Sequence, residues 1–168
     1  HTRSKKAISG AHENLDSLIK PGSELASVLQ RELSDVMWKY CGVVRDKENL
    51  LKGISNINNL KDLIACVDVR IDAEGYQDLM HLSDLKASLI TAEATLISAL
   101  KRKGSIGAHQ RSDFPASKKE SIFNYRVTLN KERKLEVISK KIEPLHNELQ
   151  KIVANTKNIQ SFKGKLIE

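Results

Sequence analysis

The sequence has few aromatic residues, few cysteines and no long apolar run. Only 4% of its 168 residues are aromatic, whereas 40% are hydrophobic. A core that is mainly aliphatic favours packed helices over an aromatic-rich β-sandwich. No apolar run approaches the roughly 20 residues of a membrane-spanning helix, so we expect no direct membrane insertion. The polar start, His1–Lys6, has no signal-peptide pattern and is interpreted as a tag remnant or the end of an upstream domain.

The cysteines and histidines show no pattern that is typical of a metal site. Cys41 and Cys66 have neither CxxC spacing nor a histidine close to them in the sequence. We interpret them as free thiols. No pair among the five histidines has the spacing of a zinc motif. We therefore predict no metal-ligating residues.

Motifs for catalysis and cofactor binding are also missing. Gly104 and Gly107 follow a helical pattern instead of a strand, so they do not form a dinucleotide-binding loop. Asp84 and Glu93 lie too far apart along one predicted helix to act as a carboxylate pair. Trp38 is interpreted as a helix anchor that packs against the other helices, in preference to a ligand-binding aromatic. We predict no catalytic or cofactor-binding residue and no cofactor in this chain.

Positive charge is concentrated towards the end of the chain. Of the net charge of +7, residues 1–100 contribute −2 and residues 101–168 contribute +9. A basic segment raises the question of nucleic-acid binding. However, glutamates are interleaved with the lysines, and neither zinc-finger spacing nor an RNA-binding motif is found. We expect a solvated basic face, or one that docks on an acidic partner domain, and no nucleic acid.

Apolar residues spaced three or four apart predict three long helices, over residues 25–44, 47–66 and 79–103. Ser23 and Asp46 are the expected N-caps of the first two. The third helix has the most regular apolar seam. It ends in a run of cations followed by Gly104, where we expect the left-handed backbone that commonly terminates a helix.

The pattern changes to period two after Pro115. Apolar and polar residues alternate over Phe123–Val137, which predicts a β-hairpin with its turn at Asn130–Arg133. A final helix is expected after Pro144. The predicted fold class is mainly α, with an antiparallel three-helix bundle, a C-terminal β-hairpin and a final helix.

These elements suggest a division into three parts. Residues 1–24 are expected to form a polar N-terminal extension or linker, and residues 25–115 the three-helix bundle. Residues 116–168 are expected to form the hairpin and the C-terminal helix, packed on the same domain because a lone hairpin is not stable by itself.

Two segments carry a resemblance to a known family. One, Val36–Arg45, holds Met-Trp followed by Gly-Val-Val-Arg; the other, Ala99–Pro115, holds a basic helix end, two glycines and Asp-Phe-Pro. In this order they resemble the C-terminal helical domain of the succinate dehydrogenase, fumarate reductase and L-aspartate oxidase flavoproteins. Ile106 stands where that family usually has arginine, and Ala116–Ile122 replaces its acidic stretch.

The resemblance implies a domain that is accessory to catalysis in a longer parent protein. FAD and a dicarboxylate would bind in the FAD-binding and capping domains, which are the implied partners; an iron–sulfur subunit is a further candidate. Succinate dehydrogenase or fumarate reductase is the first choice for the parent, and L-aspartate oxidase is the alternative. An independent helical interaction module with a basic face also stays open. The implied location is cytoplasmic, including the inner face of a membrane through partner subunits.

By analogy with the family, docking on the other domains is expected to involve polar residues around the basic turn: Arg45, Arg102, His109, Arg111 and Asp113. For His109 we favour a structural role, capping carbonyls or bonding Asp113, over acid–base catalysis. We expect Arg102, His109 and Arg111 to be exposed in this chain and nearly neutral for its stability.

Overall fold

The computed structural model describes residues 2–71, 76–114, 123–132 and 134–154. Its helices are α1 (Thr2–Asp16), α2 (Ala26–Tyr40), α3 (Lys47–Leu63), the short 3-10 helix η1 (Ile64–Cys66) and α4 (Gln77–Lys101). Its strands are β1 (Val44–Arg45), β2 (Gln110–Arg111), β3 (Phe123–Leu129) and β4 (Leu135–Lys141). Residues 147–154 are also helical. The predicted fold class is therefore confirmed.

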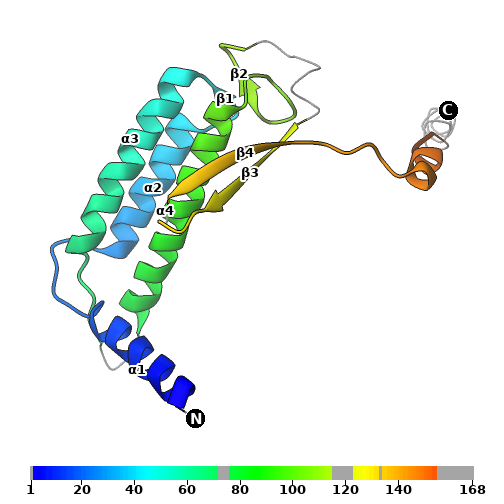
Figure 1. The fold of residues 1–168 in the computed structure, drawn as a ribbon. Helices are drawn as coiled ribbons and strands as arrows, with labels where there is room; N and C mark the ends of the chain where they lie inside the picture. Colours follow the sequence, from blue (N-terminus) through cyan, green and yellow to red (C-terminus); the bar gives the residue numbers. More distant parts are fainter. Residues whose placement is uncertain (1, 72–75, 115–122, 133, 155–168) are drawn as a thin grey trace, which may run out of the picture.

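Helices α2, α3 and α4 lie side by side as a bundle, with α3 antiparallel to the other two (Figure 1). The buried residues of the helices are mainly the apolar residues spaced three or four apart, because these positions share one face of a helix. The most deeply buried side chains are Leu29, Leu50, Ile57, Val67, Val69, Leu85, Leu89 and Leu96. Burial of each such side chain contributes about 1.5–3 kcal/mol, so this aliphatic core is the main source of stability.

One close approach within the bundle depends on a glycine. A Cβ atom added to Gly53 of α3 would lie 2.9 Å from Leu96 Cδ2 and 3.1 Å from Tyr40 Cβ. The missing side chain therefore lets α3 pack tightly against both α2 and α4.

Trp38 does not anchor the bundle, so that expectation is wrong. Its side chain is 86% exposed. The reason is geometric: Trp38 lies five residues after the buried Leu33, which places it on a different face of a helix with 3.6 residues per turn.

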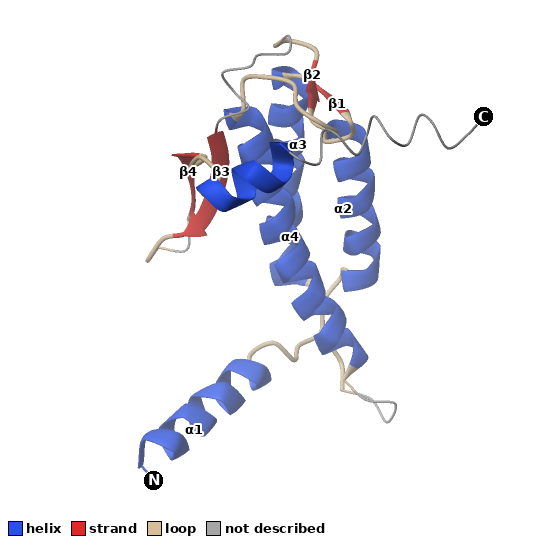
Figure 2. Ribbon diagram, turned by 90° about the vertical axis from the view of Figure 1, so that its right-hand side faces the viewer, coloured by secondary structure: helices blue, strands red, loops and turns tan. Residues whose placement is uncertain are grey.

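The segment expected to be a polar extension contains a helix and a tethered stretch. Helix α1 points away from the bundle (Figures 1 and 2). The residues that follow it bond to η1 and the segment after η1, with Ser23 N donating to Cys66 O at 2.9 Å and Val69 N donating to Lys20 O at 2.9 Å. The domain boundary at residue 24 stays a prediction.

Of the two expected N-caps, one is confirmed. Asp46 Oδ1 accepts a hydrogen bond from Asn49 N at 2.8 Å at the start of α3. Ser23 does not cap α2, since that helix begins after Leu25, which makes no side-chain capping bond. Both cysteines are free thiols, with Cys41 buried and Cys66 exposed. Burial raises the pKa of Cys41.

The hairpin is antiparallel and in the expected place, with Val127 opposite Val137. Phe123, Tyr125 and Val127 are half-buried and alternate with exposed residues, and both strands contact α4. Residues 147–154 are exposed and stand apart from the bundle in Figure 1, so the expected packing of the final helix is not seen among the described residues. Gly75, Pro115, the stretch 116–122, Arg133 and the chain after residue 154 lie outside them.

Candidate docking site at the basic turn

Two segments that are distant in sequence meet at one end of the bundle. Strand β1, which follows α2, pairs in parallel with β2, which follows α4, so that Arg45 lies opposite Arg111. Gln110 N donates to Val43 O at 3.0 Å, and Ser112 N donates to Arg45 O at 2.9 Å. This pairing assembles the site, because it brings Arg45 next to the turn that carries His109.

The turn between α4 and β2 is closed by Ile106 and His109, whose backbones exchange hydrogen bonds of 2.9 and 3.0 Å. Gly107 occupies its first central position with a φ of 56°, a left-handed backbone that disfavours other residues. The expectation of a left-handed Gly104 is therefore wrong. The chain instead leaves α4 through Arg102 in an extended conformation.

Arg111 is buried, and Arg102 and His109 are half-buried, so the expectation that these three residues are exposed is wrong. The Arg111 side chain is 1% exposed. Nη1 donates to Ala99 O at 2.9 Å and to Arg102 O at 2.9 Å, and Nε and Nη2 each donate to a different carboxylate oxygen of Asp113 at 2.7 Å. The guanidinium therefore satisfies carbonyls that the end of α4 would leave without partners.

Asp113 connects this arrangement to α3. Besides accepting both bonds from Arg111, its Oδ2 accepts from Lys47 N at 2.9 Å. These hydrogen bonds, above all those from Arg111, lower the pKa of Asp113 to about 2. The carboxylate is thus ionised at neutral pH and holds the turn against the start of α3.

His109 lies close to cations, and its bonding partner is Arg45. Arg45 Nη1 lies 2.8 Å from His109 Nδ1. A guanidinium can only donate, so Nδ1 accepts and the imidazole carries its proton on Nε2. Burial lowers the pKa of His109 to about 4, helped by the positive charges of Arg45, Arg102 and Arg111. His109 is therefore neutral at pH 7. Its structural role is the bond to Arg45, and the imidazole also approaches the backbone carbonyl of Arg102 at the end of α4.

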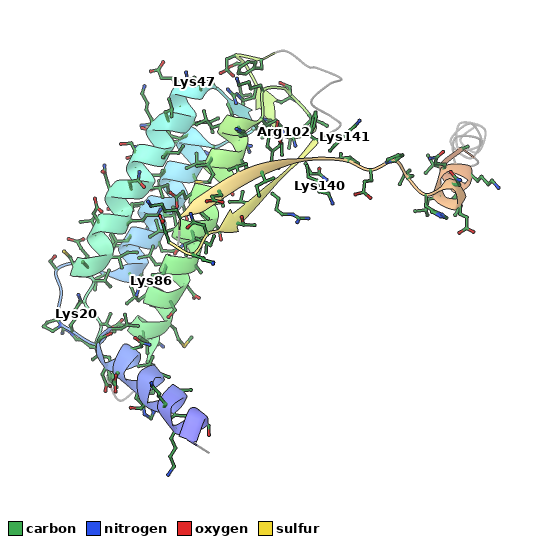
Figure 3. All side chains as sticks on the ribbon, viewed as in Figure 1. Lys20, Lys47, Lys86, Arg102, Lys140 and Lys141 are labelled. Atoms are coloured by element: carbon green, nitrogen blue, oxygen red, sulfur yellow. The ribbon has the colours of Figure 1, made fainter. Side chains whose placement is uncertain are left out.

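Arg102 attaches the hairpin to the end of α4. Its Nη2 donates to Phe123 O at 3.1 Å, and its guanidinium lies 4.6 Å from the centre of the Tyr125 ring. Figure 3 shows Arg102 at the junction of α4 and the hairpin. The five residues singled out from the sequence are thus gathered at this end of the bundle, where each of them also bonds to another group of the domain.

Sequence reasoning missed Ser105. Its hydroxyl accepts from Arg111 N at 2.8 Å and donates to Phe114 O at 3.1 Å, which closes the loop around the buried guanidinium. Its position just after a helix end is the available signal, since serine hydroxyls often bond to free backbone groups there.

The residues present do not fit a flavin dinucleotide. A pyrophosphate is usually bound at a helix N-terminus that follows a strand, and α3 follows β1 in this way. However, Asp46 caps α3 and Asp113 accepts from Lys47 N, so two carboxylates occupy that N-terminus. Within the described ranges, no group of three His, Cys, Asp or Glu could hold a metal ion. None of the helices described there has the length and apolarity to cross a bilayer.

Comparison with known proteins gives a family match over most of the chain. Residues 30–157 match the family described as the fumarate reductase flavoprotein C-terminus. A CoM/CoB fumarate reductase subunit of Methanothermobacter marburgensis is 31% identical over 120 residues, which cover 71% of this chain and 22% of that relative. An L-aspartate oxidase of Pyrococcus horikoshii is 32% identical over 88 residues, which cover 52% of this chain and 14% of that protein.

Solved structures share the fold. The FrdA chain of E. coli quinol fumarate reductase aligns with a TM-score of 0.73 at 22% identity, over 84% of this chain and 25% of FrdA. Adenylylsulfate reductase of Archaeoglobus fulgidus aligns with a TM-score of 0.63 at 19% identity, over 76% of this chain and 20% of that chain. The chain thus spans a quarter or less of the length of each of these relatives. On the match of residues 30–157, the chain belongs to the family of fumarate reductase flavoprotein C-terminal domains.

Proposed function

We propose that this domain serves a longer FAD-dependent flavoprotein of the succinate dehydrogenase or fumarate reductase type, in which it packs on the FAD-binding and capping domains and performs no chemistry alone. The family match carries the proposal. The poor fit of the described residues to a flavin supports assigning FAD and substrate to other domains. An iron–sulfur subunit is the further partner that we propose, with a cytoplasmic location or one at the inner face of a membrane through such subunits.

The docking face that we propose is the end of the bundle around β1 and the basic turn. Exposed large apolar side chains gather in the segments that meet there: Trp38, Val43, Val44 and Ile106, with exposed fractions between 43% and 86%. Arg45 and His109 are half-buried beside them. Interfaces commonly combine an aromatic anchor with arginine, so this composition suits a neighbouring domain. In this proposal Arg111 and Asp113 act by holding the turn in shape.

Expression of the domain together with the FAD-binding and capping domains of the same polypeptide tests the activity. We expect that protein to carry a flavin absorbance band and to interconvert succinate and fumarate, whereas the 168-residue chain alone shows neither. A flavin band or turnover in the purified 168-residue chain would contradict the proposal.

L-Aspartate oxidase is the second candidate activity, because proteins with that name from several Pyrococcus species are among the relatives. Oxidation of L-aspartate by the flavoprotein, without reduction of fumarate by an electron donor or oxidation of succinate, would select this alternative.

A further inference from the structure

An open pocket lies between α4, the basic turn and β3. Its volume is about 520 Å³. Its lining includes Arg45, Arg102 and His109, together with Thr95, Ser98 and Asn124. No Asp or Glu belongs to the lining among the residues that the structure describes.

The charge of Arg45 is not neutralised within the part of the chain described here. Its guanidinium donates to Gly42 O at 2.6 Å and to His109 Nδ1 at 2.8 Å, and both acceptors are neutral. Arg111 differs, since Asp113 pairs with it at 2.7 Å. Partial burial of a cation without a counterion costs desolvation free energy. An anion from outside the described residues would offset that cost at Arg45.

His109 offers a second donor to the same pocket. With Nδ1 accepting from Arg45, the proton is on Nε2, and that nitrogen is buried with no hydrogen bond of good geometry among the described atoms. The imidazole approaches the backbone carbonyl of Arg102, but that carbonyl already accepts from Arg111 Nη1 at 2.9 Å. Buried polar atoms are nearly always paired, so a buried N–H donor beside a cationic pocket, with only a shared carbonyl near it, indicates a missing acceptor. The hydroxyls of Thr95 and Ser98 already donate to carbonyls of α4, at 2.8 and 2.6 Å.

We propose that this pocket is an anion site that takes a carboxylate, bound by the guanidinium of Arg45 and the Nε2–H of His109. The free edge of a guanidinium matches the two oxygens of a carboxylate. The carboxylate could be an Asp or Glu side chain of an adjoining domain or a free small acid. A carboxylate supplied by an adjoining domain requires the docking of this face that we proposed above. Binding of a carboxylate as such does not require it.

The site predicts a response at His109. The pKa of His109 is about 4 because burial and cations, with Arg45 first among them, oppose protonation. A bound carboxylate offsets that positive field, so the imidazole titrates at higher pH when the anion is present.

Titration of the 168-residue chain with sodium acetate tests the proposal, at constant ionic strength against sodium chloride. The imidazole nitrogens of His109 are followed by NMR. We expect a saturable shift of the Nε2 signal and a raised His109 pKa. Arg45→Gln weakens acetate binding by about tenfold or more, as loss of a charge-assisted hydrogen bond predicts. Lys103→Gln removes the same charge from an exposed residue outside the lining and should leave binding unchanged.

The two sources give different results with succinate. Succinate that binds no more tightly than acetate supports a single side-chain carboxylate, whereas a strong preference for succinate supports a free dicarboxylic acid. Tighter binding of inorganic phosphate than of acetate would overturn the assignment to a carboxylate. A non-saturable drift of His109 in the wild-type chain that chloride reproduces would overturn the site itself, even if Arg45→Gln fails to fold. None of these readouts needs flavin, so they stand apart from tests of the proposed function.

Discussion

Replacement of the buried guanidinium of Arg111 is expected to destabilise the domain strongly. Arg111→Met keeps the length of the side chain and removes its bonds to Ala99 O, Arg102 O and the Asp113 carboxylate. Breaking a buried ion pair by removing one partner costs about 3–5 kcal/mol. Because the Asp113 side chain is 30% exposed and can be rehydrated, we expect the lower end, about 3 kcal/mol. That is a large part of the roughly 5–15 kcal/mol by which domains are stable.

Urea unfolding followed by far-UV circular dichroism measures this effect as a shift of the midpoint at constant slope. Arg111→Lys keeps the charge but not the planar guanidinium, so its loss of unfolding free energy should be intermediate. Lys103→Met removes an exposed cation from the same loop and should change stability by less than about 0.5 kcal/mol. If the free energy of unfolding of Arg111→Met lies within about 0.5 kcal/mol of the wild-type value, then the buried network does not stabilise the domain and the reasoning is wrong.

Three further predictions concern the same end of the bundle. The folded-state pKa of His109 is lowered to about 4 from an ordinary 6.5, so its contribution to stability is complete above pH 6.5 and is lost as the pH falls towards 4. His109→Gln should therefore flatten this part of the curve of unfolding free energy against pH. An unchanged slope would contradict the assignment. Gly107→Ala should cost about 1 kcal/mol in urea unfolding because of its left-handed backbone, whereas Gly104→Ala should lack that penalty, and equal losses would refute it. Trp38→Ala should leave the stability of this chain within about 0.5 kcal/mol, since the side chain is 86% exposed, and a larger loss would show that the indole packs on the domain.

The bundle and the hairpin were predictable because each repeats a simple period. The seam of α4 from Leu82 to Leu96 follows the helical period, and Phe123 to Val127 alternates as a strand. Helix α1 has no comparable signal, since Thr2–Asp16 is mostly polar and buries no apolar face.

The site could be predicted only in part. Its residues were found as a cluster of polar groups near a helix end, but their partners depend on tertiary contacts. Arg45 and His109 are 64 residues apart and meet only because β1 pairs with β2. The burial of Arg111 likewise follows from where the turn folds back on the end of α4, which a local pattern does not encode. Residue type alone predicts that Trp38 packs against the other helices, whereas its position on the helix places it outside.

Hydroxyl-radical footprinting of Trp38 tests the central claim that this end of the bundle docks on other domains of a flavoprotein. Trp38 is the only tryptophan of the chain, so its oxidation is assigned without ambiguity in a peptide from this region. The rate is compared between the 168-residue chain and a polypeptide that also contains the FAD-binding domain. Exposed Tyr76, which directly precedes α4, is the internal reference. We predict that Trp38 is oxidised several-fold more slowly in the longer protein while Tyr76 is unchanged. Equal rates for Trp38 in a longer protein that binds flavin would contradict the claim.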